Sequence, residues 1–151
     1  MPASLLSQIS WIALVAIFAL AVWRGGWPER FGAAFSIIGA LVALIIHDFT
    51  SPDIAPLLLL AADAALAGAF LFLAVRYASL WLGAAMILQA GQFALHAIYT
   101  AGELAPDRRY AVINNLITLG IFLVILLATL ARWMSRDARQ AAEAPETSPE
   151  A

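Results

Sequence analysis

Four polar residues, Gln89, Gln92, His96 and Tyr99, recur at spacings of three, four and three within an apolar stretch. At 100° per residue these positions occupy an arc of about 80° on one face of a helix. A polar face on a membrane helix needs an inward-facing partner or a water-filled cavity, because lipid tails form no hydrogen bonds. These residues are therefore candidates for binding a ligand or relaying a proton.

Polar residues on the neighbouring apolar stretches supply partners for this face. Asp63 is the only acid deep within such a stretch. A charged group at the centre of a membrane span costs about 2.5–3.5 kcal/mol. We therefore expect Asp63 to be either protonated or paired with His96. Counted along each helix, Asp63 and Gln92 lie about 4 Å, and His96 and Asn114 about 10 Å, to the same side of the bilayer midplane. The predicted polar layer comprises Asp63, Gln89, Gln92, His96, Tyr99, Asn114 and Asn115.

Several kinds of chemistry fit these residue types. The favoured interpretation is a non-enzymatic accessory subunit, or a small-ligand or lipid-binding protein, with a polar pocket open to the outside. The alternative is an oligomeric, proton-coupled transporter of small molecules in which Asp63 and His96 relay the proton. A third hypothesis is a b-type haem held by His47 and His96, or a divalent metal held by these two histidines with Asp48 and Asp63. Gln and Asn side chains also join membrane helices without any further role.

Five apolar stretches must position these residues. They comprise residues 5–23, 31–47, 56–75, 80–99 and 110–133. A bilayer core requires about 20 apolar residues in a helix. The third and fourth stretches, read as one helix, would be about 66 Å long, so the chain must turn between them, with Ser79 as a candidate N-cap. We therefore predict an all-α bundle of five transmembrane helices over residues 1–134.

Composition excludes most other classes of protein. The 151 residues are 64% hydrophobic and only 12% charged, whereas a soluble domain carries about 25% charge. This composition argues against a cytosolic enzyme, a nucleic-acid-binding protein and a disordered chain. The sequence has no Cys and no Lys, which removes thiolate and Schiff-base chemistry. We expect the chain to lie in a lipid bilayer. Its expected protein partners are another membrane protein or further copies of the same chain.

The arginines predict the orientation, because positive residues near the ends of spans remain cytoplasmic. An external N-terminus and a cytoplasmic C-terminus place six arginines inside and leave only Arg108 and Arg109 outside.

Residues 135–151 are polar, contain two prolines and carry almost no large apolar side chain. We predict that they form a disordered cytoplasmic tail.

Short motifs in the first two thirds of the chain resemble small, uncharacterised five-span proteins of bacterial inner membranes. The residues concerned are Trp23-Arg24-Gly25-Gly26, Glu29-Arg30, Asp63, Arg76-Tyr77, Trp81 and His96. The resemblance implies a multi-pass protein of the bacterial inner (plasma) membrane, and it carries no known activity.

Overall fold

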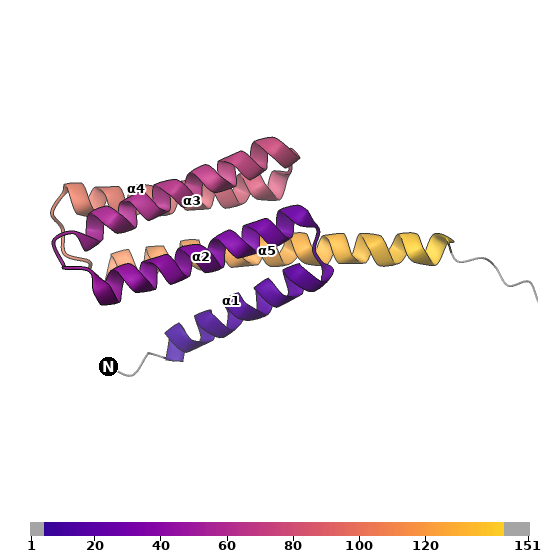
Figure 1. Ribbon diagram of the computed structural model, residues 1–151, viewed down its shortest axis with the longest axis horizontal. Helices are drawn as coiled ribbons and strands as arrows, with labels where there is room; N and C mark the ends of the chain where they lie inside the picture. The colour runs from indigo at the N-terminus through magenta and orange to yellow at the C-terminus, as the bar shows by residue number, and fades with distance from the viewer. Residues whose placement is uncertain (1–4, 144–151) are drawn as a thin grey trace, which may run out of the picture.

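The computed structural model describes residues 5–143, with side chains described from Trp11 onward. Within this range the chain is helical and contains no strand. The helices are α1 (Leu5–Arg24), α2 (Trp27–Phe49), α3 (Ala55–Tyr77), α4 (Leu80–Ala101) and α5 (Arg108–Glu143) (Figure 1). Each helix contains one of the five predicted apolar stretches, and the prediction of an all-α, five-helix bundle is confirmed.

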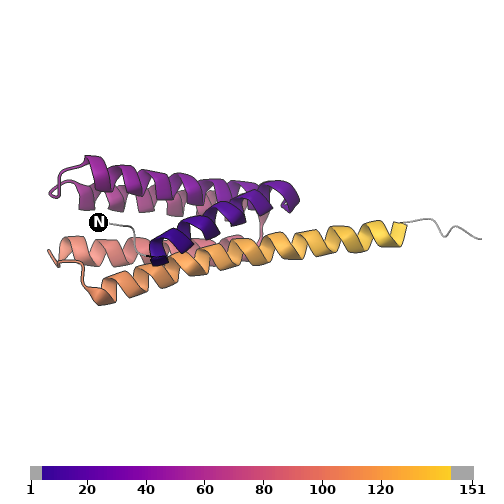
Figure 2. The same ribbon diagram turned by 90° about the horizontal axis from the view of Figure 1, so that it is seen from below.

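The helices run antiparallel to their neighbours in sequence and form a closed bundle. Each helix packs against the next one along the chain, and α5 returns to pack against α1 and α2. The α1–α2 and α3–α4 connections therefore lie at one end, together with the last turns of α5 (Figures 1 and 2). We call this the arginine end, after Arg24, Arg30, Arg76, Arg132, Arg136 and Arg139. The opposite end, with the α2–α3 and α4–α5 connections, is called the loop end.

Local chemistry explains where the helices stop and start. At Gly25 a Cβ atom would lie 2.4 Å from the carbonyl oxygen of Ala21, so only glycine fits at this close turn. α2 then begins with Pro28 in its first turn, and the carboxylate of Glu29 accepts a 2.8 Å hydrogen bond from the backbone N–H of Gly26. Ser79 occupies the N-cap position of α4 as predicted, although its hydroxyl makes no capping hydrogen bond.

A small apolar core lies inside the bundle, and the exterior is also apolar. Leu14, Phe70, Leu82 and Ile125 are almost fully buried, whereas many large apolar side chains on the outer faces are exposed, such as Phe72 at 67%. A water-soluble monomer rarely exposes apolar patches of this extent. Four of the described helices, α2 to α5, are long and apolar enough to cross a membrane. These features together indicate a membrane protein.

The helical extension of α5 corrects one prediction. The structure continues α5 through Ser135 to Glu143, so the expected disorder is wrong for residues 135–143. The physical reason is that this segment is rich in Ala, Arg, Gln and Glu, which have high helix propensity. A helix already nucleated within the bundle gains one hydrogen bond for each residue it adds. The remaining predicted tail, residues 144–151, lies outside the described residues.

Ala78 offers a test of the α3–α4 turn. This residue ends α3 in the left-handed conformation, with φ 47° and ψ 44°, which an L side chain disfavours by about 1 kcal/mol or more. We expect Ala78→Gly to raise the free energy of unfolding in detergent by about 1 kcal/mol. The control Ala74→Gly, inside the same helix, should lower it by about 1 kcal/mol. A loss of stability in both variants would contradict the assigned turn.

Candidate functional site

A cavity of about 520 Å³ lies between the helices, and all five contribute to its wall. The polar part of the wall consists of Ser36, Asp63, Gln89, Gln92, His96, Tyr110, Asn114, Asn115 and Thr118. The apolar part includes Trp11, Leu14, Leu66, Ile121 and Phe122. We call this space the central cavity. Six of the seven residues of the predicted polar layer therefore lie around one space.

Asp63 is the centre of the polar wall. Its carboxylate is buried, with the residue only 9% exposed. One carboxylate oxygen accepts a 3.3 Å hydrogen bond from the side-chain amide of Gln89, and the other contacts Nδ1 of His96. Both partners come from α4, seven residues apart and hence on one face of that helix. The predicted pairing of Asp63 with His96 is present in the structure.

The Asp63–His96 pair has a defined chemical capacity. With Nδ1 directed at the carboxylate, the second ring nitrogen of His96 is left to interact with other groups. The pair can therefore accept a hydrogen bond from a ligand or donate one to it.

A second contact joins α4 to α5 beside this pair. Gln92 donates from its side-chain amide to the amide oxygen of Asn114 at 3.1 Å. Thr118 donates to the backbone oxygen of Asn114 within α5 at 3.0 Å. Amide pairs of this kind satisfy one another, which fixes the two helices side by side. Asn115 lines the central cavity next to them and is exposed.

Tyr99, the seventh predicted residue, lies outside the central cavity. Its hydroxyl donates a 2.8 Å hydrogen bond to Asp107 in the α4–α5 connection. The same carboxylate oxygen accepts a 2.8 Å hydrogen bond from the backbone N–H of Tyr110, in the first turn of α5. These hydrogen bonds, that from Tyr110 above all, favour the charged form and hold the pKa of Asp107 below its ordinary value.

Two aromatic contacts separate the central cavity from a second one at the loop end. The ring of Tyr110 stacks on that of His96 at 5.5 Å between centroids and contacts the ring of Tyr99 at 4.8 Å. The second cavity, of about 390 Å³, is lined by residues of α3, α4, α5 and the 102–107 connection. His96, Tyr110 and Leu59 line both cavities, so they form the partition between them.

His47 does not join this site. It is exposed near the end of α2 and lines neither cavity, and the same holds for Asp48. His96 is instead engaged by Asp63 and Tyr110. Among the described residues no three His, Asp or Glu side chains are grouped so that they could hold a metal ion. The structure thus does not bring together the two histidines proposed for a haem or a metal.

Several cavity residues, among them Tyr110, Ser36 and Trp11, were not among the predicted site residues. Tyr110 precedes Asn114 by four positions, as Asn114 precedes Thr118, so helical spacing could have placed it on the same face. Ser36 donates to the backbone oxygen of Gly32 within its own helix at 3.0 Å, and nothing in the sequence indicates that it faces a cavity. Trp11 belongs to an apolar stretch without polar periodicity, so only packing reveals its position.

Comparison of the chain with known proteins finds no relative. No protein-family model, curated protein or solved structure matches the chain. A proposal for its function therefore depends on the geometry and chemistry of the cavity.

Substitutions at Asp63 test the polar wall. Asp63→Ala removes the acceptor used by both Gln89 and His96, and we expect the free energy of unfolding in detergent to fall by about 3 kcal/mol. Asp63→Asn keeps a side-chain oxygen and should lose only about 1 kcal/mol. Asp48→Ala, which removes an exposed carboxylate from α2, serves as the control and should change stability little. Equal losses at positions 63 and 48 would argue against a structural role for the buried carboxylate.

Proposed function

We propose that the chain is a multi-pass protein of a bacterial inner membrane that binds a small polar ligand in its central cavity. It acts without catalysis, alone or as an accessory subunit of a larger membrane protein. The N-terminus and the loop end face outside, and the arginine end faces the cytoplasm. The position of Arg24, Arg30 and Arg76 at one end supports this orientation, because arginines beside membrane spans stay on the cytoplasmic side.

The observation that carries this proposal is the composition of the cavity wall. A volume of about 520 Å³ is in the range of small-molecule sites, which are typically about 300–1,000 Å³. The Asp63–His96 pair and the amides of Gln92 and Asn115 offer both donors and acceptors along one side. Trp11 and Phe122 offer aromatic surface within the same cavity. This combination suits a molecule with a hydrogen-bonding edge and an apolar body.

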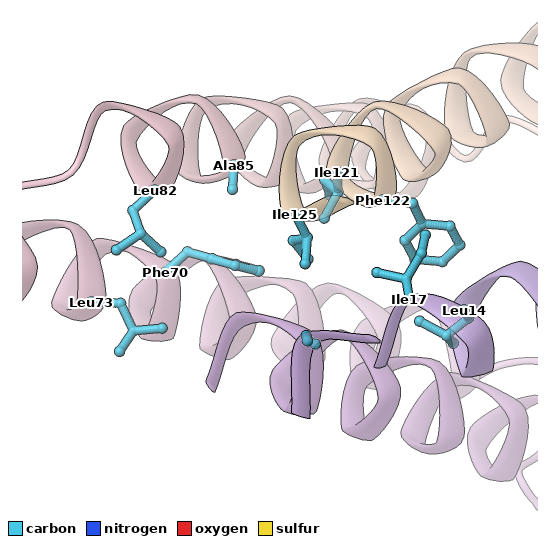
Figure 3. Packing of buried hydrophobic residues seen from close by; sticks show 11 residues of the cluster. Leu14, Ile17, Phe70, Leu73, Leu82, Ala85, Ile121, Phe122 and Ile125 are labelled. Atoms are coloured by element: carbon cyan, nitrogen blue, oxygen red, sulfur yellow. The ribbon is translucent and has the colours of Figure 1, made fainter. Parts of the chain in front are cut away.

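The base of the cavity favours binding over passage across the membrane. Leu14, Ile121 and Phe122 belong both to the cavity wall and to the buried apolar cluster (Figure 3). Beyond them, toward the arginine end, the cluster continues with Phe70 and Leu82, which have no exposed surface. A cavity closed by packed apolar side chains offers no hydrogen-bonded path to the other side.

The second candidate function is proton-coupled transport. The contact between Asp63 and His96 favours it, since paired acid and imidazole groups inside a membrane commonly relay protons. Transport would require the apolar cluster at the base of the cavity to separate during each cycle, which binding does not require.

A cavity-filling variant tests ligand binding. Ala62 lines the central cavity, whereas Ala64 on the same helix is exposed on the outer face. Native mass spectrometry of protein purified from native membranes should detect a bound small molecule in wild type and in Ala64→Phe. Ala62→Phe should lose it, because the added ring occupies the cavity. A wild-type protein without ligand, or equal retention in both variants, would contradict the proposal.

Proton flux into liposomes distinguishes the second candidate. Asp63→Asn removes the relay carboxylate but keeps an oxygen for Gln89, so a transporter should lose its proton flux. If the protein only binds a ligand, wild type and variant should both show no flux above that of protein-free liposomes.

A further inference from the structure

The arginine end carries a surplus of positive charge that the central cavity does not use. In the described part of the chain, six arginines at this end face three carboxylates, those of Glu29, Asp137 and Glu143. The six are Arg24, Arg30, Arg76, Arg132, Arg136 and Arg139. Within residues 11–143 only one of them, Arg132, lies within ion-pair distance of an acid, with its Nε 3.9 Å from Glu29.

The carboxylate of Glu29 already has a structural role in the fold. The residue is buried, at 4% exposure, and its carboxylate accepts the backbone N–H of Gly26 at the start of α2. Arg132 lies against the same turn, because a Cβ atom at Gly26 would stand only 2.4 Å from its Nε. This contact ties α5 to the α1–α2 turn. None of the other guanidinium groups of the arginine end lies within ion-pair distance of a carboxylate in the described chain.

Arg24 and Arg136 meet beside this contact. The guanidinium of Arg24 lies over two indole rings, 4.3 Å from the centroid of Trp23 and 4.5 Å from that of Trp133. Arg136 reaches the backbone oxygen of Arg24 at 3.5 Å. The Nε atoms of Arg24 and Arg30 and the indole nitrogen of Trp133 are buried without a hydrogen-bond partner among the described residues, although such groups normally have one.

The spacing on α5 extends the cluster along one face. Arg132, Arg136 and Arg139 follow one another at intervals of four and three, which confines them to an arc of about 60°. Since Arg132 contacts Glu29 and Arg136 contacts Arg24, this face is turned toward the end of α1. The α5 extension runs past the other helices in Figure 1 and carries Arg136 and Arg139 with it.

We infer that Arg24 and Arg136, with Arg132 and Arg139 beside them, bind the phosphate of an anionic membrane lipid. Guanidinium groups match phosphate oxygens in geometry and charge. The exposed rings of Trp23 and Trp27, at 70% and 65%, lie at the same end of the bundle, and indoles prefer the interface between headgroups and acyl chains. Charge and aromatic rim together therefore select a lipid headgroup at the cytoplasmic surface. This site does not depend on a ligand in the central cavity.

Lipid titration of the full-length protein tests this inference. We expect native mass spectrometry in a neutral detergent to show tighter binding of phosphatidylglycerol than of phosphatidylcholine. An arginine near a membrane surface contributes about fivefold to anionic-lipid affinity, so Arg24→Gln with Arg136→Gln should weaken phosphatidylglycerol binding about 25-fold. The matched control, Arg108→Gln with Arg109→Gln, removes the same charge from the loop end and should leave the binding unchanged.

Two more variants separate lipid binding at the arginine end from misfolding and from binding in the central cavity. Arg136→Gln alone changes an exposed side chain and should lower the affinity about fivefold without altering thermal unfolding. Ala62→Phe, which fills the central cavity, should bind phosphatidylglycerol as wild type does. Equal binding of the two lipids, or equal losses in the two double variants, would overturn the inference. Displacement of the lipid by millimolar inorganic phosphate would also overturn it, because the site would then serve free phosphate.

Discussion

The polar interior of this bundle is arranged around one buried carboxylate. Asp63 lies within an apolar helix, far from any connection, where neither lipid nor its own backbone can solvate it. Gln89 and His96, about two turns apart on α4, supply the polar contacts to this carboxylate. Their contact fixes the rotation of α4 about its axis, so that Gln92 on the same face reaches Asn114 of α5. The central cavity lies where these three helices, turned in this way, present polar groups to α1 and α2.

The molecule is divided along its length into regions of different physical character. Toward the loop end, the polar side chains surround two cavities separated by His96 and Tyr110. In the middle, Phe70, Leu82 and Ile125 form a packed apolar layer. At the arginine end, Arg132 approaches the buried Glu29, and the guanidinium of Arg24 lies over the indole ring of Trp133. The apolar layer separates the two polar regions, so the proposed cavity ligand and the proposed lipid would occupy separate sites.

Much of this arrangement could be predicted, because helical periodicity is a local property. The spacing of Gln89, Gln92 and His96 places them on one face of any helix, and counting residues from each helix centre brings Asp63 to a similar depth. Depth alone was insufficient for His47, which lies on an exposed face near the end of α2. Tyr99 shares the predicted face but lies three residues beyond His96, and its hydroxyl bonds to Asp107 in the connection. Its position depends on a loop whose path has no periodic signal.

The five helices, the face that carries the polar residues and the segregation of arginine to one end could all be inferred from the amino-acid order. Each of these follows from composition and from a repeat of 3.6 residues within one segment. Which faces meet, in contrast, was set by tertiary packing. Packing placed Trp11 in the cavity wall, turned Glu29 inward against Gly26 and Arg132, and continued α5 through a segment whose polarity suggested disorder. These features depend on how each helix is rotated and tilted against the others, which is fixed by contacts between residues far apart in the chain.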